Sequence, residues 1–106
     1  MDERETRFWD AAAEVMRAPG VARSTMMGFP CLRVDAKFFA TFDRGSGGLV
    51  VKLPKDRVDR LIADGSGQPF APAGRRFREW VAIPVAAERD WPAYLSEALG
   101  FAAQAA

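Results

Sequence analysis

The sequence predicts a small α+β domain in which helices pack on one face of an antiparallel sheet. Segments with helical spacing of apolar residues stand near both ends of the chain, and shorter segments with strand-like alternation lie between them. Hydrophobic residues make up 49% of the chain and charged residues 27%, which is typical of a globular protein. Because 106 residues is one domain's length, we assign residues 1–106 to a single domain.

The first expected element is a helix over residues 3–17. Asp2 suits the N-cap, and Glu5 three positions later completes a capping-box pattern. Pro19 and Gly20 end the helix, because the residue before a proline is disfavoured in the α region and glycine permits the exit. The apolar residues that recur at helical spacing are Phe8, Trp9, Ala12, Val15 and Met16.

A hairpin is expected next, and residues 21–27 before it are compatible with a further strand. The hairpin arms are residues 31–34 and 37–42, which alternate apolar and polar side chains around Asp35 and Ala36. The sequence therefore places two or three strands before residue 43.

The second arm of the hairpin and the segment after it complete this group of strands. Alternation predicts that Phe38, Ala40 and Phe42 share one face. Residues 43–48 form a loop by composition, and residues 49–53 return as a strand. Three or four antiparallel strands result.

A short amphipathic helix is expected after these strands. Pro54 suits its first turn, where a backbone N–H is not needed, and Gly65 ends it. Its apolar stripe is formed by Val58, Leu61 and Ile62.

A second hairpin and a last helix complete the chain. Residues 68–70 form a short edge strand and residues 78–83 its partner. Asp90 caps the last helix, and Pro92 lies in its first turn. The buried stripe of this helix is Trp91, Leu95, Ala98, Leu99 and Ala102. The predicted order is therefore α, three or four β, α, two β, α.

The residue types present exclude several kinds of chemistry. With no His and one Cys, the chain has no Ser-His-Asp triad, no Cys–His pair, no His-ligated metal and no internal disulfide. We therefore expect no catalytic residues, no cofactor and no metal. The charged first residues and the absence of a long apolar run indicate a cytoplasmic protein without a membrane span.

Two polar motifs favour structural roles. The glycine-rich loop at residues 45–48 is followed neither by Gly-Lys-Ser/Thr nor by a helix, so we interpret it as a hairpin loop rather than a phosphate cradle. Asp56 and Asp59 are surrounded by basic residues, with Arg60 four positions after Asp56. We expect these carboxylates to be ionised and ion-paired rather than tuned as an acid and a base.

The single cysteine is expected to be a buried structural thiol. Cys31 lies beside Leu32 and near Val34 in an apolar strand pattern, where a thiol behaves as a small hydrophobe. A reactive thiol is the alternative, because Arg33 lies two residues away and a cation can lower a thiol pKa.

The charge is unevenly distributed along the chain. The net charge of +1 divides into −3 over residues 1–16, +7 over residues 17–78 and −3 over residues 79–106. Such asymmetry indicates an anionic partner, but acidic helices flanking a basic sheet would produce it as well.

The strongest candidate site lies in the basic part. Arg75, Arg76 and Arg78 are interleaved with Phe77 and Trp80, a composition typical of surfaces that bind nucleic acid through phosphates and stacked bases. In the alternative interpretation, Trp80 fills the core with Phe70 or Phe77, and the arginines are solvated or pair with Asp64, Glu79 and the acidic helices. We expect Trp9, Trp80 and Trp91 to lie in the core rather than to form a ligand cage.

Four motifs resemble the N-terminal domain of TfoX/Sxy competence regulators. The chain reads Ser-Thr-Met-Met-Gly-Phe-Pro-Cys-Leu-Arg-Val from residue 24 and Leu-Val-Val-Lys-Leu-Pro from residue 49. It then reads Gln-Pro-Phe-Ala-Pro-Ala-Gly from residue 68 and Arg-Glu-Trp-Val-Ala-Ile-Pro from residue 78. The resemblance covers most of residues 20–102 and extends to the related MmcQ/YjbR-like proteins.

This resemblance implies a secretion-chaperone-like fold with the element order given above. It also implies a non-catalytic regulatory or interaction module that acts through protein–protein contacts, with a protein partner or a second copy of the chain, as a homodimer. The alternative is a DNA-binding protein of the MmcQ/YjbR type that uses the central basic segment, with Arg75, Arg76, Phe77 and Arg78 as the candidate residues.

Overall fold

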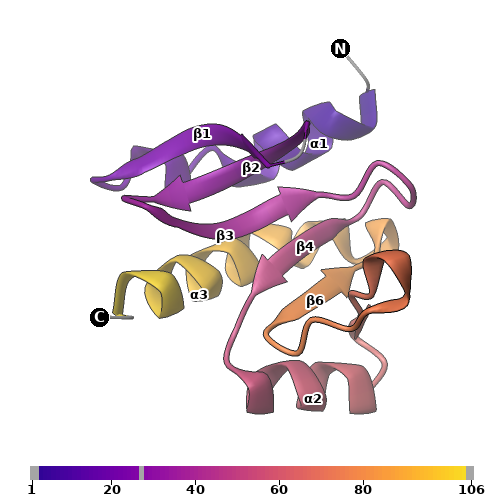
Figure 1. Ribbon diagram of the computed structural model, residues 1–106. Helices are drawn as coiled ribbons and strands as arrows, with labels where there is room; N and C mark the ends of the chain where they lie inside the picture. Colours follow the sequence, from indigo (N-terminus) through magenta and orange to yellow (C-terminus); the bar gives the residue numbers. More distant parts are fainter. Residues whose placement is uncertain (1–2, 27, 105–106) are drawn as a thin grey trace.

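A computed structural model describes residues 3–26 and 28–104 of the chain (Figure 1). Six strands form one antiparallel sheet in the order β1-β2-β3-β4-β6-β5. The strands are β1 (Val21–Met26), β2 (Phe29–Val34), β3 (Lys37–Phe42), β4 (Leu49–Lys52), β5 (Gln68–Pro69) and β6 (Trp80–Ile83). The helices are α1 (Glu3–Ala12), α2 (Lys55–Ala63) and α3 (Trp91–Gln104). The α+β class, the element order and the antiparallel pairing predicted from the sequence are confirmed.

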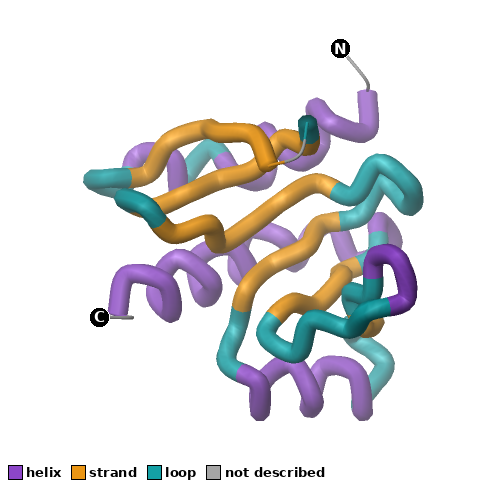
Figure 2. Tube along the Cα trace, viewed as in Figure 1, coloured by secondary structure: helices purple, strands orange, loops and turns teal. Residues whose placement is uncertain are grey.

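The hydrophobic core lies between the helices and one face of the sheet. Phe8 of α1, Leu61 of α2 and both Trp91 and Leu95 of α3 belong to one buried cluster with the inward side chains of the strands. In Figures 1 and 2, α3 passes behind β3 and β4, which it contacts. None of the described α-helices packs on the opposite face of the sheet.

The first helix is shorter than predicted. It ends at Ala12, and a 3₁₀ turn over Val15–Arg17 follows in place of a continuous helix to residue 17. The turns tighten because Ala13 N donates to Asp10 O at 3.3 Å and Arg17 N to Glu14 O at 3.1 Å, bonds between residues three apart. The tighter turn still buries Val15 beside β1. The proposed N-cap, Asp2, lies outside the described residues, as does Met27 at the end of the first predicted strand.

The alternation predicted for β3 is broken by a bulge. Leu32 pairs with Ala40 but Arg33 pairs with Phe38, so Phe39 is an extra residue on β3. Phe39, Ala40 and Phe42 therefore all belong to the core, whereas Phe38 is only half-buried and does not. The expectation that Phe38 shares a face with Ala40 and Phe42 is wrong.

The boundaries of the second half differ by one or two residues from those predicted. Pro54 is the N-cap of α2 rather than part of its first turn. Gly65, with a φ of +85°, ends the helix as expected. The last strand begins at Trp80 instead of residue 78, and Asp90 belongs to a 3₁₀ segment, Val85–Asp90, that precedes α3. None of the described helices is both long enough and apolar enough to cross a membrane.

Candidate functional site

The uncovered face of the sheet presents a row of paired residues that runs across all six strands. Cys31, Thr41 and Val50 lie at the centre of this row, paired in register with one another and flanked by Ser24 and Ala82. Cys31 and Val50 are fully buried although neither belongs to the helix-side core. Something other than the helices therefore covers part of this face.

The connection between β5 and β6, residues 70–79, lies over part of this face. Trp80 and Ala82 alternate with the core residues Val81 and Ile83, so Trp80 points to the uncovered face. The Phe70 ring lies 6.5 Å from the Trp80 ring and 6.0 Å from the Phe77 ring, measured between centroids. Three aromatic side chains thus form one cluster on this face.

Backbone hydrogen bonds hold this connection in place. Phe77 N donates to Phe70 O at 2.9 Å, and Trp80 N donates to Phe77 O at 3.1 Å. Between them, a single 3₁₀ turn contains Ala73 and Gly74, both at positive φ. The loop returns sharply on itself, which brings Phe77 back onto Phe70.

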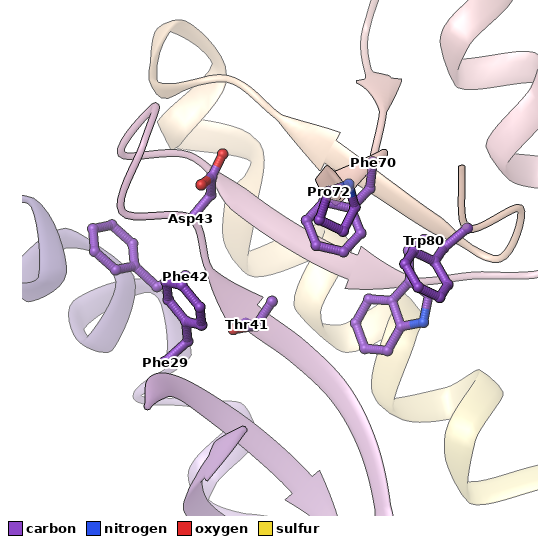
Figure 3. Close-up of a pocket in the computed structure, with 8 residues that line it drawn as sticks. Phe29, Thr41, Phe42, Asp43, Phe70, Pro72 and Trp80 are labelled. Carbon is purple, nitrogen blue, oxygen red and sulfur yellow. The ribbon is translucent and has the colours of Figure 1, made fainter. Parts of the chain in front are cut away.

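An apolar pocket opens between the aromatic cluster and the centre of the sheet (Figure 3). Its volume is about 350 Å³. Phe29 and Phe77 are the large apolar side chains most exposed among the described residues, at 42% and 39%. The pocket is lined by Phe29, Thr41, Phe42, Asp43, Phe70, Pro72, Phe77 and Trp80.

The side-chain oxygens that line the pocket are already hydrogen-bonded within the protein. Thr41 Oγ1 donates to Pro30 O at 2.8 Å. The Asp43 carboxylate accepts from Gly45 N at 3.0 Å and from Ser46 Oγ at 2.8 Å, which stabilises the turn between β3 and β4. The pocket therefore suits an apolar or aromatic group.

Arginines lie over the two exposed phenylalanines. The Arg44 guanidinium carbon is 5.5 Å from the centre of the Phe29 ring, and that of Arg75 is 5.7 Å from the centre of the Phe77 ring. The rim of the apolar pocket is consequently positive at two separated points.

The candidate residues chosen from the sequence all lie on the surface of this loop. Arg75, Arg76, Phe77 and Arg78 are exposed. Arg76 Nη2 lies 3.3 Å from Asp59 Oδ1, an exposed ion pair with a partner different from those expected. Of these four residues, only Phe77 lines the pocket.

The alternative interpretation, in which the nearby aromatics fill the core, is wrong for this segment. Phe70, Phe77 and Trp80 are all outside the core cluster, whereas Trp91 is buried in it and Trp9 packs against its edge. The side chains on both faces of β6 are apolar, Trp80 and Ala82 on one face and Val81 and Ile83 on the other. It is Val81 and Ile83 that enter the core. The pocket residue Phe29 was not singled out in the sequence, because it comes from a different strand.

The other sequence candidates have structural roles. Cys31 is buried, and burial raises the pKa of its thiol, against smaller lowering effects from a hydrogen bond with Ser24 and the charge of Arg33. Within the described part of the chain, Asp56 and Arg60 form no ion pair; Asp59 pairs with Arg76 instead. No group of three or more metal-ligating side chains comes together in residues 3–26 and 28–104.

Comparison of the chain with protein-family models, with curated proteins and with solved structures finds no match.

Proposed function

We propose that the protein is a non-catalytic interaction module that binds a short segment of a partner protein in the aromatic pocket. The observation that carries this proposal is an apolar pocket of about 350 Å³ on the sheet face without helices, with two phenylalanines exposed at its rim. Exposed apolar surface that is concave and already formed is typical of a recognition site.

The burial of one large side chain is enough to make such binding favourable. An aromatic side chain that loses about 150 Å² of accessible surface gains about 4 kcal/mol at 25 cal/mol per Å², before the cost of association. The arginines over Phe29 and Phe77 add a charge preference. We therefore infer a partner segment that carries an aromatic or large aliphatic residue flanked by Asp or Glu. The resemblance to TfoX/Sxy regulators supports a regulatory role for the module.

A displayed library of random peptides tests this proposal. The library is selected on the wild-type protein and counter-selected on a Phe29→Ala/Phe77→Ala variant, which should fold because neither ring belongs to the hydrophobic core. Phe101→Ala is the matched control, since Phe101 lies on α3 and does not line the pocket.

We expect enriched peptides to share an aromatic or large aliphatic residue with neighbouring acidic residues. Their Kd should rise at least about tenfold on the double variant, which corresponds to about 1.4 kcal/mol, and stay unchanged on the Phe101→Ala control. Peptides that bind the double variant as tightly as the wild type would refute the proposal.

Nucleic-acid binding is a second candidate, and one observation favours it. Arg75, Arg76 and Arg78 are exposed in one loop with Phe77, and exposed arginines beside an aromatic ring are typical of surfaces that bind phosphates and bases. Arg75 lies over one face of the Phe77 ring and Arg76 pairs with Asp59, so a nucleic acid would have to displace these contacts. Replacing the three arginines with Ala should weaken binding to unrelated DNA sequences equally, because phosphate contacts carry no sequence information. The slope of log affinity against log salt should flatten by up to about 2.7.

An Arg89→Ala variant is the control for this second candidate, because Arg89 is exposed and lies outside the loop. If the wild-type protein binds neither duplex nor single-stranded DNA at low salt and micromolar concentration, this candidate is eliminated.

A further inference from the structure

A second groove lies beside the aromatic pocket. It has a volume of about 530 Å³ and is more open and more polar than the pocket. Trp9 of α1, Arg23 and Ser24 of β1, and Arg44 of the β3–β4 turn contribute to it. Because Arg44 stacks on Phe29, which lines the aromatic pocket, the Arg44–Phe29 pair is the boundary between the two depressions.

Two guanidinium groups in this groove are held by aromatic rings. The Arg23 guanidinium carbon lies 4.2 Å from the centre of a Trp9 ring, and Arg44 occupies the corresponding position over Phe29 at 5.5 Å. Stacking on a ring fixes the plane of a guanidinium and leaves the N–H groups at its edge available.

The positive charge of these two arginines is not neutralised by an ion pair. Within the part of the chain that the structure describes, neither Arg23 nor Arg44 lies within 4.0 Å of a carboxylate oxygen. Glu5, the acidic residue of the groove, already accepts a hydrogen bond from Trp9 Nε1 at 3.0 Å. The groove therefore contains two oriented guanidinium groups and a single carboxylate, that of Glu5, which is already hydrogen-bonded to Trp9.

We propose that Arg23 and Arg44 form a carboxylate-binding subsite, so that the pocket and the groove together take a peptide segment with an aromatic residue and a nearby Asp or Glu. This inference rests on the proposed function of the aromatic pocket and adds the chemistry of the second contact. A guanidinium edge matches a carboxylate with two parallel hydrogen bonds, which a neutral amide cannot replace.

A peptide fits the groove better than a nucleic acid does. Base binding needs open aromatic faces, but the guanidinium of Arg23 covers one face of Trp9 and that of Arg44 covers one face of Phe29. The rings of Trp9 and Phe29 thus serve to orient the arginines and are not open platforms on which a base could stack.

Fluorescein-labelled peptides that carry one Phe and one Asp, with the Asp placed one to four residues after the Phe, provide the first test. Each has a twin with Asn in place of Asp, and each is titrated against wild type, Arg23→Gln/Arg44→Gln and the control Arg89→Gln. At the best spacing, we expect the Asp-to-Asn change to weaken binding about tenfold on wild type and on the control. The same change should have less than about a twofold effect on the Arg23→Gln/Arg44→Gln variant.

The peptide test separates the subsite from the pocket. Replacing the Phe of the peptide with Ser should remove most of the binding to every variant. If the Phe is required but Asp and Asn peptides bind wild type equally at all spacings, the carboxylate subsite is refuted and the proposed function stands. If an oligothymidylate displaces the peptide and itself depends on Arg23 and Arg44, the occupant is a nucleic acid and the peptide inference is overturned.

A second measurement judges the subsite even if no peptide binds. In protein labelled with ¹⁵N at arginine, glutarate is titrated and the Nε–Hε resonances are followed. We expect those of Arg23 and Arg44 to shift together and saturate, while that of Arg89 does not saturate. If the Arg23 and Arg44 resonances do not respond, the subsite is refuted; if they respond although no peptide binds, only the proposed function of the pocket fails.

Discussion

Gly48 lies against the backbone of β6, and no larger residue fits there. A Cβ atom at Gly48 would lie 2.8 Å from the carbonyl oxygen of Ile83, which cannot move without distorting the strand. We expect Gly48→Ala to destabilise the protein by about 1–3 kcal/mol through this overlap. Denaturant unfolding would measure the change.

Gly100 provides the matched comparison, because it lies within α3 and a Cβ atom added there would meet nothing within 4 Å. Gly100→Ala should stabilise the protein by roughly 0.5–1 kcal/mol, since glycine is unfavourable inside a helix. Equal unfolding midpoints for the two variants would contradict the close approach at Gly48.

Cys31 provides a prediction about labelling and pH. Because the thiol is fully buried, a thiol reagent at neutral pH should label the native protein far more slowly than the denatured chain. Burial also raises the pKa of the thiol, so the folded state holds this proton more tightly than the unfolded chain. The corresponding stability is present below the thiol's unfolded pKa, about 8.5, and is lost as pH rises through the higher folded pKa.

The contribution of the thiol is isolated by Cys31→Ala. Between pH 7 and pH 10, the free energy of unfolding should fall more steeply for wild type than for this variant, because other titrating groups are common to both. Labelling of the native protein at the rate of the denatured chain would show that the site is open.

Trp80 of β6 and Trp91 of α3 differ in how deeply they are buried. Trp91 is completely buried in the core, whereas Trp80 is half-buried and lines the pocket. We expect Trp91→Ala to cost about 3–5 kcal/mol of stability and Trp80→Ala clearly less. Unfolding by urea, followed by far-ultraviolet circular dichroism, compares the two variants. A larger loss for Trp80→Ala would place that residue in the core after all.

The sequence predicts most elements because local signals coincide with them. Asp35 and Ala36 lie in the turn between β2 and β3, where the sequence places it, and Gly65 supplies the positive φ that ends α2. The bulge at Phe39 could not be predicted, because residues 38, 40 and 42 satisfy regular alternation equally well. Only pairing with β2, which is a non-local contact, selects Phe39 for the core.

The pocket could not be predicted from the sequence, for a similar reason. The Arg-Arg-Phe-Arg run was selected for its composition as a nucleic-acid surface, and only Phe77 of that run lines the pocket. The other walls come from β2, from β3 and from Phe70, and their proximity depends on strand order and on the return of the loop. The orientation of Trp80 depends on which of two apolar alternations in β6 faces the helices, and sequence alternation alone does not decide this.

The two edges of the sheet differ in their capacity to pair with another chain. The edge strand β5 is two residues long and contains Pro69, which lacks an N–H donor. The edge strand β1 has six residues and pairs on one side only, with β2. An open edge of this length favours association, so we predict that two copies form a dimer through β1.

Light scattering coupled to size-exclusion chromatography measures this association. At tens of micromolar, we expect a mass near twice 11.6 kDa that falls on dilution. A mass of one chain that is independent of concentration would count against a dimer.

Because all three α-helices pack on one face of the sheet, the binding surface can change in sequence separately from the core. The residues that hold the fold together face the helices, whereas Phe29, Phe77, Arg23 and Arg44 lie outside that core. Substitutions at these positions should therefore cost less stability than substitutions in the core. Natural drift could alter which partner is preferred while the scaffold stays constant, and a laboratory library restricted to these positions should yield mostly folded members with new binding preferences.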